Sequence, residues 1–311
     1  MRVVIAGATG FIGQALCREL AGDYEIVALS RDAKKASGIL AQYGRVVEWD
    51  GRTTSGWAAE ASGARAIVNL AGEPIVGRWS QSTKASIRHS RFQSAKAVID
   101  AIEAAHAKPD VFVQGSAIGF YGLRTDEVLD EESSTGRGFL ADVCRRLEGA
   151  AAKCEAQGVR SVIARTGVVL GRDGGALPKL MRPFRFYLGG HVGNGKQWFS
   201  WISLQDEVRA IRFLIENGAA RGAFNLTAPE PVTMKAFCQA LGQAMGRPCW
   251  TAVPGPAVHL LAGEMAKEVL LAGQRVIPKR LMEAGFEFTH SDAAEALASI
   301  IQGEEHGRES A

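Results

Sequence analysis

The chain opens with an apolar strand that runs into a glycine-rich turn and then into a helix. Residues 3–6 read Val-Val-Ile-Ala, residues 7–13 read Gly-Ala-Thr-Gly-Phe-Ile-Gly, and an amphipathic pattern covers residues 11–20. A strand buried on both faces of a parallel sheet reads as a continuous apolar run, and glycine allows the tight turn after it. This unit predicts an α/β fold with a parallel sheet.

Strands and helices continue to alternate over the first half of the chain. Apolar runs of strand length lie at residues 26–29, 46–49, 66–70, 111–114 and 162–164. Longer helical patterns separate the later runs, at residues 82–107 and 139–157. This alternation is typical of a Rossmann-type, doubly wound parallel sheet with helices on both faces.

Glycine and proline become frequent just beyond the midpoint of the chain, which indicates a second, loop-rich unit. We expect a Rossmann domain over residues 1–170, to which a helix and a strand within 203–227 return. A smaller C-terminal substrate lobe is expected from residues 171–202 and 228–302. The polar residues 303–311 predict a frayed tail.

Charge and apolar content exclude several kinds of protein. Charged residues make up 22% of the chain, and the net charge of +3 comes from scattered Lys and Arg, which argues against a nucleic-acid partner. Neither a secretory signal nor an apolar run of ~18 residues is present, so we expect a cytoplasmic protein without a membrane partner. The five cysteines and six histidines show no metal-ligand spacing, which predicts reduced thiols and no metal site. Oligomeric state is left open.

The glycine turn has the chemistry of a phosphate-binding segment. Gly7 permits the tight turn, Gly10 lets the backbone approach a phosphate, and the helix that starts near Phe11 offers free N–H groups to negative charge. The residues expected to contact a pyrophosphate are Gly7, Thr9, Gly10, Phe11, Ile12 and Gly13. The position between strand and helix predicts a bound dinucleotide rather than a purely structural turn.

The end of the second strand distinguishes between the two nicotinamide cofactors. Proteins that prefer NAD commonly place Asp or Glu there to bind the ribose 2′-hydroxyl, whereas this strand ends in Ser30 and Arg31. A serine hydroxyl can donate to a 2′-phosphate, and a guanidinium meets it with a permanently charged fork. Asp32 is the alternative, as an acceptor for a 2′-hydroxyl. Ser30 and Arg31 favour NADP(H).

A series of motifs in a fixed order follows the turn. They are Asn69-Leu-Ala-Gly-Glu-Pro-Ile, Arg78-Trp79, Ser90-Arg91, Gly115-Ser-Ala-Ile-Gly-Phe-Tyr-Gly122, Arg165-Thr-Gly-Val-Val-Leu-Gly171, Gly195-Lys-Gln-Trp-Phe-Ser-Trp201 and Pro278-Lys-Arg-Leu. Together with the Gly-x-x-Gly-x-x-Gly turn, they make the chain resemble the YfcH-like group of epimerase family proteins. This group belongs to the extended and atypical short-chain dehydrogenases/reductases, and the resemblance covers roughly residues 1–302.

The resemblance implies further cofactor contacts. Leu70 and Ala71, at the end of the fourth strand, correspond to the backbone that passes the adenine ribose, and Gly72 beside them is expected to bind the cofactor. Arg91 corresponds to a helix residue turned toward the nucleotide, and Val168 to a backbone contact with the nicotinamide end. The alternative roles are sheet packing for the apolar residues and a solvated helix charge for Arg91.

The resemblance also shows that the usual catalytic pair is missing. Relatives use a tyrosine and a lysine four residues later, whose charge lowers the pKa of the phenol. Phe139 and Val143 occupy these positions, and no tyrosine of the chain has a lysine at that spacing.

Three other residues are candidates for proton transfer. Tyr121 and Ser116 follow the fifth strand, and Glu73 follows the fourth, at the edge of the sheet where doubly wound proteins bind ligands. Their alternative roles are structural: a buried aromatic with a local hydrogen bond, a turn-forming serine, and a surface ion pair between Glu73 and Arg78.

These features lead to one principal functional hypothesis. We expect an NADP(H)-dependent oxidoreductase or epimerase-like enzyme with an atypical active site, acting on an unknown small-molecule substrate. The alternative is a cofactor-binding sensor or scaffold without catalysis, which would directly explain why Phe139 and Val143 stand in place of the catalytic pair. A conventional nucleotide-sugar epimerase ranks third, because it needs the missing pair.

Overall fold

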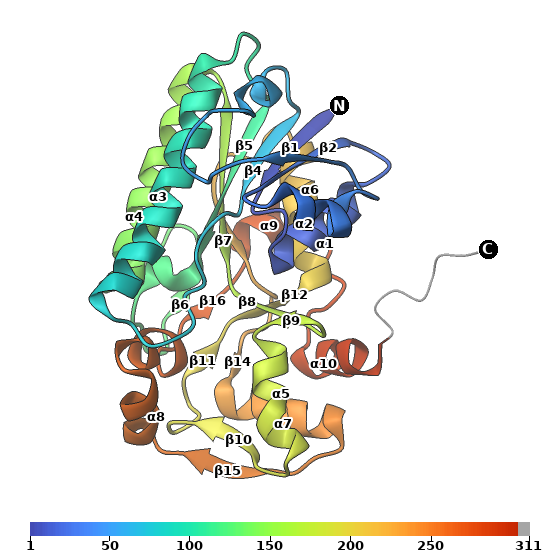
Figure 1. Ribbon diagram of the computed structural model, residues 1–311. Coiled ribbons are helices and arrows are strands. Elements are labelled where there is room, and N and C mark those ends of the chain that lie inside the picture. The colour runs from blue at the N-terminus through green and yellow to red at the C-terminus, as the bar shows by residue number, and fades with distance from the viewer. Residues whose placement is uncertain (304–311) are drawn as a thin grey trace, which may run out of the picture.

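A computed structural model describes residues 1–303 of the chain and has one parallel sheet as its central layer (Figure 1). The seven strands follow the order β13-β7-β5-β4-β1-β2-β3. They are β1 (Arg2–Ala6), β2 (Glu25–Ser30), β3 (Arg45–Glu48), β4 (Ala66–Asn69), β5 (Val111–Ala117), β7 (Arg160–Thr166) and β13 (Gly222–Leu226). This arrangement confirms the predicted Rossmann-type fold. The strand order reverses between β1 and β4, which is where such sheets bind ligands.

Helices cover both faces of the sheet (Figure 1). Helices α3 (Gln81–Ala104) and α4 (Phe139–Ala151) lie side by side on one face. Helices α1 (Phe11–Leu20) and α6 (Leu204–Glu216) pack together on the other face. The sheet is therefore screened from solvent on both sides, which explains its continuous apolar strands.

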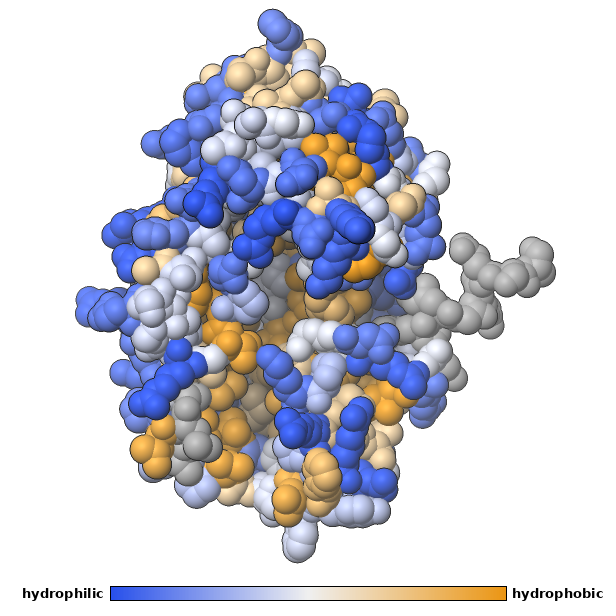
Figure 2. Space-filling view, viewed as in Figure 1, coloured by the Kyte–Doolittle hydropathy of each residue, from blue (hydrophilic) through white to orange (hydrophobic). Residues whose placement is uncertain are grey.

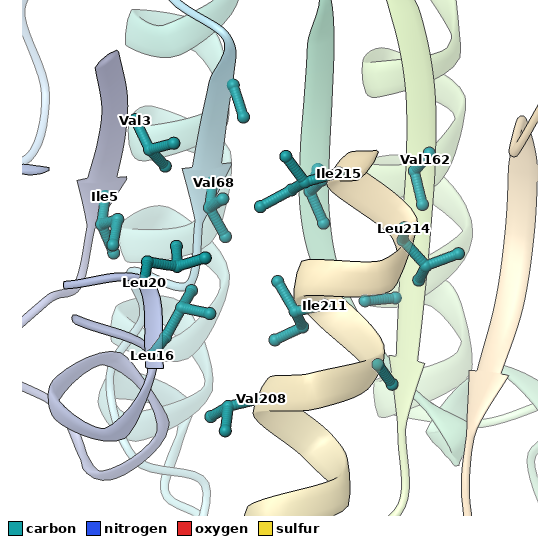
Figure 3. Packing of buried hydrophobic residues seen from close by; sticks show 14 of the residues in the cluster. Val3, Ile5, Leu16, Leu20, Val68, Val162, Val208, Ile211, Leu214 and Ile215 are labelled. Atoms are coloured by element: carbon teal, nitrogen blue, oxygen red, sulfur yellow. The ribbon is translucent and has the colours of Figure 1, made fainter. Parts of the chain in front are cut away.

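Helix α6 binds the second half of the chain to the first. Its apolar residues Val208, Ile211 and Leu214 recur every three positions and so share one helical face. Figure 3 shows this face turned toward Leu16 of α1 and toward the strands. Strand β13, which follows α6, pairs in parallel with β7 at the edge of the sheet.

Two helical segments differ from the sequence-based expectation. Helix α2 (Ala33–Leu40) was not predicted, because its sequence shows only a weak apolar pattern and contains Gly38. Asp32 starts this helix by accepting a hydrogen bond from the backbone N–H of Lys35 at 2.9 Å. The helix predicted to reach residue 157 ends as α4 at Ala151, and a 3₁₀ segment, η3 (Ala152–Gln157), continues it.

The second lobe contains short strands and helices around a separate core. Its helices are α5 (Leu177–Arg185), α7 (Met234–Met245), α8 (Gly255–Ala262) and α10 (Ala293–Gln302). Helix α9 (Lys279–Glu283), which was expected in this lobe, packs on β13 instead, and its Leu281 belongs to the core of the sheet domain. The short strands outside the central sheet are β6 (Val128–Leu129), β8 (Val168–Gly171), β9 (Gly174–Gly175), β10 (Gly189–Val192), β11 (Trp198–Phe199), β12 (Trp201–Ser203), β14 (Val232–Thr233), β15 (Cys249–Val253) and β16 (Arg275–Val276). The predicted frayed tail lies, beyond residue 303, outside the described residues. Within residues 1–303, no helix combines the length and apolarity needed to cross a membrane.

Candidate cofactor site and the polar network beside it

The glycine turn joins β1 to α1 at the point where the strand order reverses. Gly7 has a φ of 81°, and a Cβ on it would lie 2.8 Å from the backbone nitrogen of Ala71. A Cβ on Gly13 would lie 2.3 Å from the carbonyl oxygen of Gly7, so the helix can approach the turn only without a side chain there. No described side chain caps α1. The N–H groups of its first turn therefore remain available to an anion.

A cavity of about 840 Å³ opens in front of this turn. Its walls come from the glycine turn, the ends of β2, β3 and β4, and the first half of α3. Among the predicted site residues, those that line it are Gly7, Thr9, Gly10, Ser30, Arg31, Leu70, Ala71, Gly72 and Glu73. The structure thus brings most of the predicted cofactor residues and one proton-transfer candidate to a single cavity.

Phe11 and Ile12 stand behind the cavity instead. The ring of Phe11 fills the space that side chains at Gly174 and Gly175 of β9 would occupy, and Ile12 packs against the core of the sheet. Only the backbone of these two residues, at the start of α1, faces the phosphate-binding end of the site.

The end of β2 places two different groups at the cavity. Ser30 is buried, and its hydroxyl donates to the carbonyl oxygen of Asp32 at 3.1 Å. Arg31 is 74% exposed in its side chain and forms a 3.2 Å ion pair with Glu73. Asp32, the alternative ribose acceptor, is engaged as the cap of α2. Both Arg31 and Glu73 line the cavity, so an anion that enters here meets the Arg31 guanidinium while it is paired with the Glu73 carboxylate.

The loop after β3 supplies a second guanidinium that the sequence analysis did not identify. Arg52 lines the cavity and forms no ion pair or side-chain hydrogen bond with another residue of 1–303. Asp50 holds the loop by accepting hydrogen bonds from the backbone of Thr53 and Arg52, both at 2.8 Å, which lowers its pKa. The indoles of Trp49 and Trp57 both donate to the carbonyl oxygen of Thr53. The sequence Trp49-Asp-Gly-Arg52, directly after a strand of the same sheet edge, was the available signal.

Arg91 does not line the cavity but holds the loop that does. Its Nη1 donates to the carbonyl oxygen of Glu73 at 2.9 Å and to that of Ile87 at 3.2 Å. Gly72 leaves room for this guanidinium, since a Cβ there would lie 3.0 Å from its Cζ. Burial lowers the pKa of Arg91. In this conformation Arg91 positions the backbone between β4 and α3. It is therefore neither the nucleotide contact nor the solvated helix charge that the sequence analysis considered.

Tyr121 and Ser116 belong to a buried network beside the cavity. The hydroxyl of Tyr121 donates to Asn225 at 2.7 Å and accepts from Arg165 at 2.9 Å. Arg165 also forms a buried ion pair with Glu148 at 2.9 Å, and Ser116 donates to Glu148 at 2.6 Å. Neither Tyr121 nor Ser116 lines the cavity.

The geometry of this network argues against Tyr121 as a proton donor. The residue is 0% exposed, both of its polar partners are buried, and burial raises the pKa of its phenol to about 12. A general acid must reach the substrate, and a fully buried hydroxyl with two protein partners does not. The structural alternative, a buried aromatic with a local hydrogen bond, describes what is observed.

The positions of the missing catalytic pair are filled by packing. The ring of Phe139 meets that of Trp79 edge-on, with centroids 5.1 Å apart, and Val143 is buried. Glu268, from a π-helical turn of the second lobe, η4 (Ala266–Leu270), accepts the backbone N–H groups of Phe139 and Leu140 at 2.9 and 3.0 Å. A carboxylate from the second lobe thus caps the N-terminus of α4.

Val168, a predicted cofactor contact, lies just beyond the carboxyl end of β7. Val168 begins β8, where its N–H donates to the carbonyl oxygen of Ser200, and it does not line the cavity.

Glu207 of α6 is fully buried and accepts a hydrogen bond from Thr166 at 2.8 Å. Its Oε2 has no partner within residues 1–303, and burial raises the pKa of its carboxyl to about 8. Glu207 could not be singled out from the sequence, because its position on an amphipathic helix looks ordinary.

A glycine turn at a helix N-terminus, placed at the reversal point of a doubly wound parallel sheet, defines a nucleotide-binding α/β protein. The chain belongs to the NAD dependent epimerase/dehydratase family, which it matches over residues 3–227, and residues 253–300 match a domain of unknown function, DUF1731.

Relatives and solved structures agree with this assignment. The chain is 42% identical over 308 residues to the chloroplastic epimerase family protein SDR39U1 homolog of Arabidopsis thaliana, covering 97% of this chain and 87% of that protein. It is 37% identical to the epimerase family protein YfhF of Bacillus subtilis, covering 97% and 98% of the two chains. The crystal structure of human epimerase family protein SDR39U1 with NADPH superposes with a TM-score of 0.88 at 31% identity, covering 97% and 99%.

Proposed function

We propose that the chain binds NADP(H) in the cavity at the carboxyl edge of its sheet and acts as an oxidoreductase or epimerase-like protein on a small substrate. The observation that carries the proposal is the convergence of the glycine turn and of two arginines, Arg31 and Arg52, on one cavity. The human relative solved with NADPH supports it.

The residues present fit this cofactor. A Cβ on Gly10 would lie only 3.1 Å from the carbonyl oxygen of Gly7, so the turn is shaped for close backbone approach. The uncapped start of α1 offers N–H groups to a pyrophosphate. Arg31 and Arg52 would hold the additional 2′-phosphate, which carries the charge that distinguishes NADP(H) from NAD(H).

A bound nicotinamide would supply hydride chemistry. The residues of the chain would bind and orient the cofactor and the substrate, and would move the proton. Ser116 and Glu73 remain the candidates for the proton step, as proposals. Glu73 lines the cavity directly, whereas Ser116 is half-buried and donates to Glu148.

The cofactor proposal is tested by comparing NADPH with NADH. We expect NADPH to bind more tightly, and Arg31→Ala and Arg52→Ala each to lower NADPH affinity about ten- to a hundred-fold, because a charged hydrogen bond contributes about 1.5–3 kcal/mol. NADH affinity should change much less. Titration calorimetry of the parent and of both variants with each cofactor measures all six affinities.

Arg18→Ala is the matched control, because Arg18 is exposed in the last turn of α1, at the helix end opposite the glycine turn. It should leave both affinities unchanged. Equal affinities of the parent protein for NADPH and NADH, or identical losses for both cofactors in the Arg31 and Arg52 variants, would refute the assignment.

A sensor or scaffold that binds NADP(H) without catalysis is the second candidate. It is favoured by the packing of Phe139 against Trp79 and by the buried hydroxyl of Tyr121, since neither residue can transfer a proton to a substrate. A screen of aldehydes and ketones separates the two. Consumption of NADPH, abolished by Glu73→Gln or Ser116→Ala, supports an oxidoreductase, whereas binding without consumption supports the sensor.

A further inference from the structure

Two stretches of the second lobe carry positive charge and no negative charge. Residues 174–205 and 231–263 contain no Asp or Glu, although the whole chain holds 33 acidic and 36 basic residues. Their cations are Lys179, Arg182, Arg185, Lys196, Lys235 and Arg247. None of the six forms an ion pair within residues 1–303. Within the described residues, these six cations therefore have no acidic partner.

Three of these cations follow one line along helix α5. Lys179, Arg182 and Arg185 are three residues apart, so their side chains lie along one face of the helix. All three are exposed, whereas Met181 and Phe184 on the opposite face are buried in the core of the lobe. The outer face of α5 is a basic stripe.

Helix α5 leads directly into exposed apolar residues. Phe186, Tyr187 and Leu188 are 67%, 53% and 60% exposed, and Trp250 of β15 is 73% exposed. The Trp250 indole donates to the carbonyl oxygen of Tyr187 at 2.8 Å, which fixes the two aromatic residues side by side. The guanidinium of Arg247 lies 4.5 Å from the centre of the Tyr187 ring. Arg247, Tyr187 and Trp250 thus lie together on the surface, at the C-terminal end of α5.

The turn that presents these residues has a costly backbone conformation. Tyr187 has a φ of 59° and is the one non-glycine residue within 1–303 with a positive φ. Large side chains rarely adopt this region, so the conformation persists only where surrounding contacts impose it. Here the N–H groups of Tyr187 and Leu188 donate to the carbonyl oxygens of Phe184 and Pro183, and the turn leaves all three residues 186–188 exposed.

We call this surface the basic tip and define it as Lys179, Arg182, Arg185, residues 186–188 and Trp250. Figure 1 places β15 at the end of the lobe that lies farthest from the sheet, and α5 runs from β9 toward this end. At this end, Figure 2 shows hydrophobic and hydrophilic residues side by side. The exposed apolar residues of the tip thus lie away from the sheet domain.

We infer that the basic tip docks onto the surface of an anionic lipid bilayer. Tryptophan and tyrosine favour the boundary between headgroups and acyl chains, and lysine and arginine are attracted to anionic headgroups. The exposed aromatic residues and the basic stripe provide both of these signals together. A second copy of the same surface does not fit, because it would place unpaired cations opposite one another.

This inference concerns elements outside the cofactor cavity and does not depend on the proposed function. It differs from the sequence-based expectation of no membrane partner, which the vesicle experiment tests. That expectation rested on the lack of a spanning segment, and a protein that lies on a bilayer needs none.

The experiment measures binding of the full chain to vesicles by sedimentation. We expect binding to phosphatidylcholine vesicles that contain phosphatidylserine, little binding to phosphatidylcholine alone, and weaker binding as salt increases. The double variant Arg182→Ala/Arg185→Ala should lower the partition coefficient about 25-fold, because each basic residue near the surface contributes about five-fold. Trp250→Ser should also weaken binding, since Trp250 is exposed and its loss leaves the core intact.

The matched control is Arg145→Ala/Arg146→Ala, which removes two exposed arginines from α4. We expect unchanged vesicle binding for this control, and unchanged NADPH affinity for the tip variants, which shows that they are folded. Three results would overturn the inference: equal binding to both kinds of vesicle, unchanged binding of the tip variants, or no vesicle binding at low salt. Binding of polyglutamate by the tip in the absence of vesicle binding would assign the surface to an acidic protein instead.

Discussion

Glu207 offers a direct test of how burial affects the stability of this fold. Its carboxyl lies under the end of β7 with one hydrogen bond, from Thr166, and one oxygen without a partner in the described chain. Glu207→Gln keeps the shape of the side chain and the acceptor for Thr166 but removes the ionisation. The amide replaces the unpartnered oxygen with an unpartnered nitrogen, which has a cost that does not vary with pH between 5 and 8.

The magnitude follows from the pKa of Glu207. Burial raises it from 4.5 to about 8, so between these pH values the folded protein retains a proton that the unfolded chain has released. Stability from this group is fully present below pH 4.5 and is lost as the pH rises toward 8. The slope approaches about 1.4 kcal/mol per pH unit, and the whole window amounts to on the order of 5 kcal/mol as an upper limit.

Urea unfolding followed by tryptophan fluorescence, repeated at several pH values, measures this difference. The free energy of unfolding of Glu207→Gln, relative to the parent protein, should rise steadily as the pH increases through the window. Glu155→Gln, at an exposed position of η3, is the control and should give a difference that does not depend on pH. Parallel stability curves for Glu207→Gln and the parent would show that the buried carboxyl does not hold its proton, and would refute the reasoning.

Three further substitutions test the network and the glycine turn. Tyr121→Phe should destabilise the fold by about 1–3 kcal/mol in urea unfolding, because buried partners lose a hydrogen bond, while NADPH affinity stays unchanged. Glu148→Gln breaks a buried ion pair with Arg165 and should cost about 3–5 kcal/mol by the same measurement; a loss below 1 kcal/mol would contradict the burial of the pair. Gly13→Ala places a Cβ 2.3 Å from the Gly7 carbonyl oxygen, so titration calorimetry should show weakened NADPH binding. Unchanged affinity would show that the turn relaxes freely.

The sheet was predictable because its strands are buried on both faces. Runs such as Val3–Ala6 and Val111–Gln114 are continuous apolar segments, and each is observed as part of a strand. Helix α2 escaped prediction because its stability comes from the cap at Asp32 and from packing, not from a strong periodic pattern. Asp32, which the sequence analysis considered as a ribose ligand, is thus the N-cap of that helix.

The cofactor cavity was partly predictable, and the network beside it was not. The glycine turn and the end of β2 are local in sequence, so a motif identifies them. The environment of Tyr121 depends on Arg165 and Asn225, which lie 44 and 104 positions away in the chain. Arg52 lines the cavity because of the loop after β3, which Asp50 and the indoles of Trp49 and Trp57 hold by hydrogen bonds. Such placements are set by tertiary packing, which spacing along the chain does not encode.

The contact of Glu268 with the start of α4 has a consequence for any attempt to build the usual catalytic pair into this chain. Glu268 accepts the backbone N–H groups of Phe139 and Leu140 and so holds the helix start against the C-terminal lobe. A lysine at Val143 would put a charge into a buried position of the same helix, which costs free energy unless the charge gains a partner. Phe139→Tyr with Val143→Lys would therefore strain the junction between the two lobes, and the pair would need further substitutions around it to be tolerated.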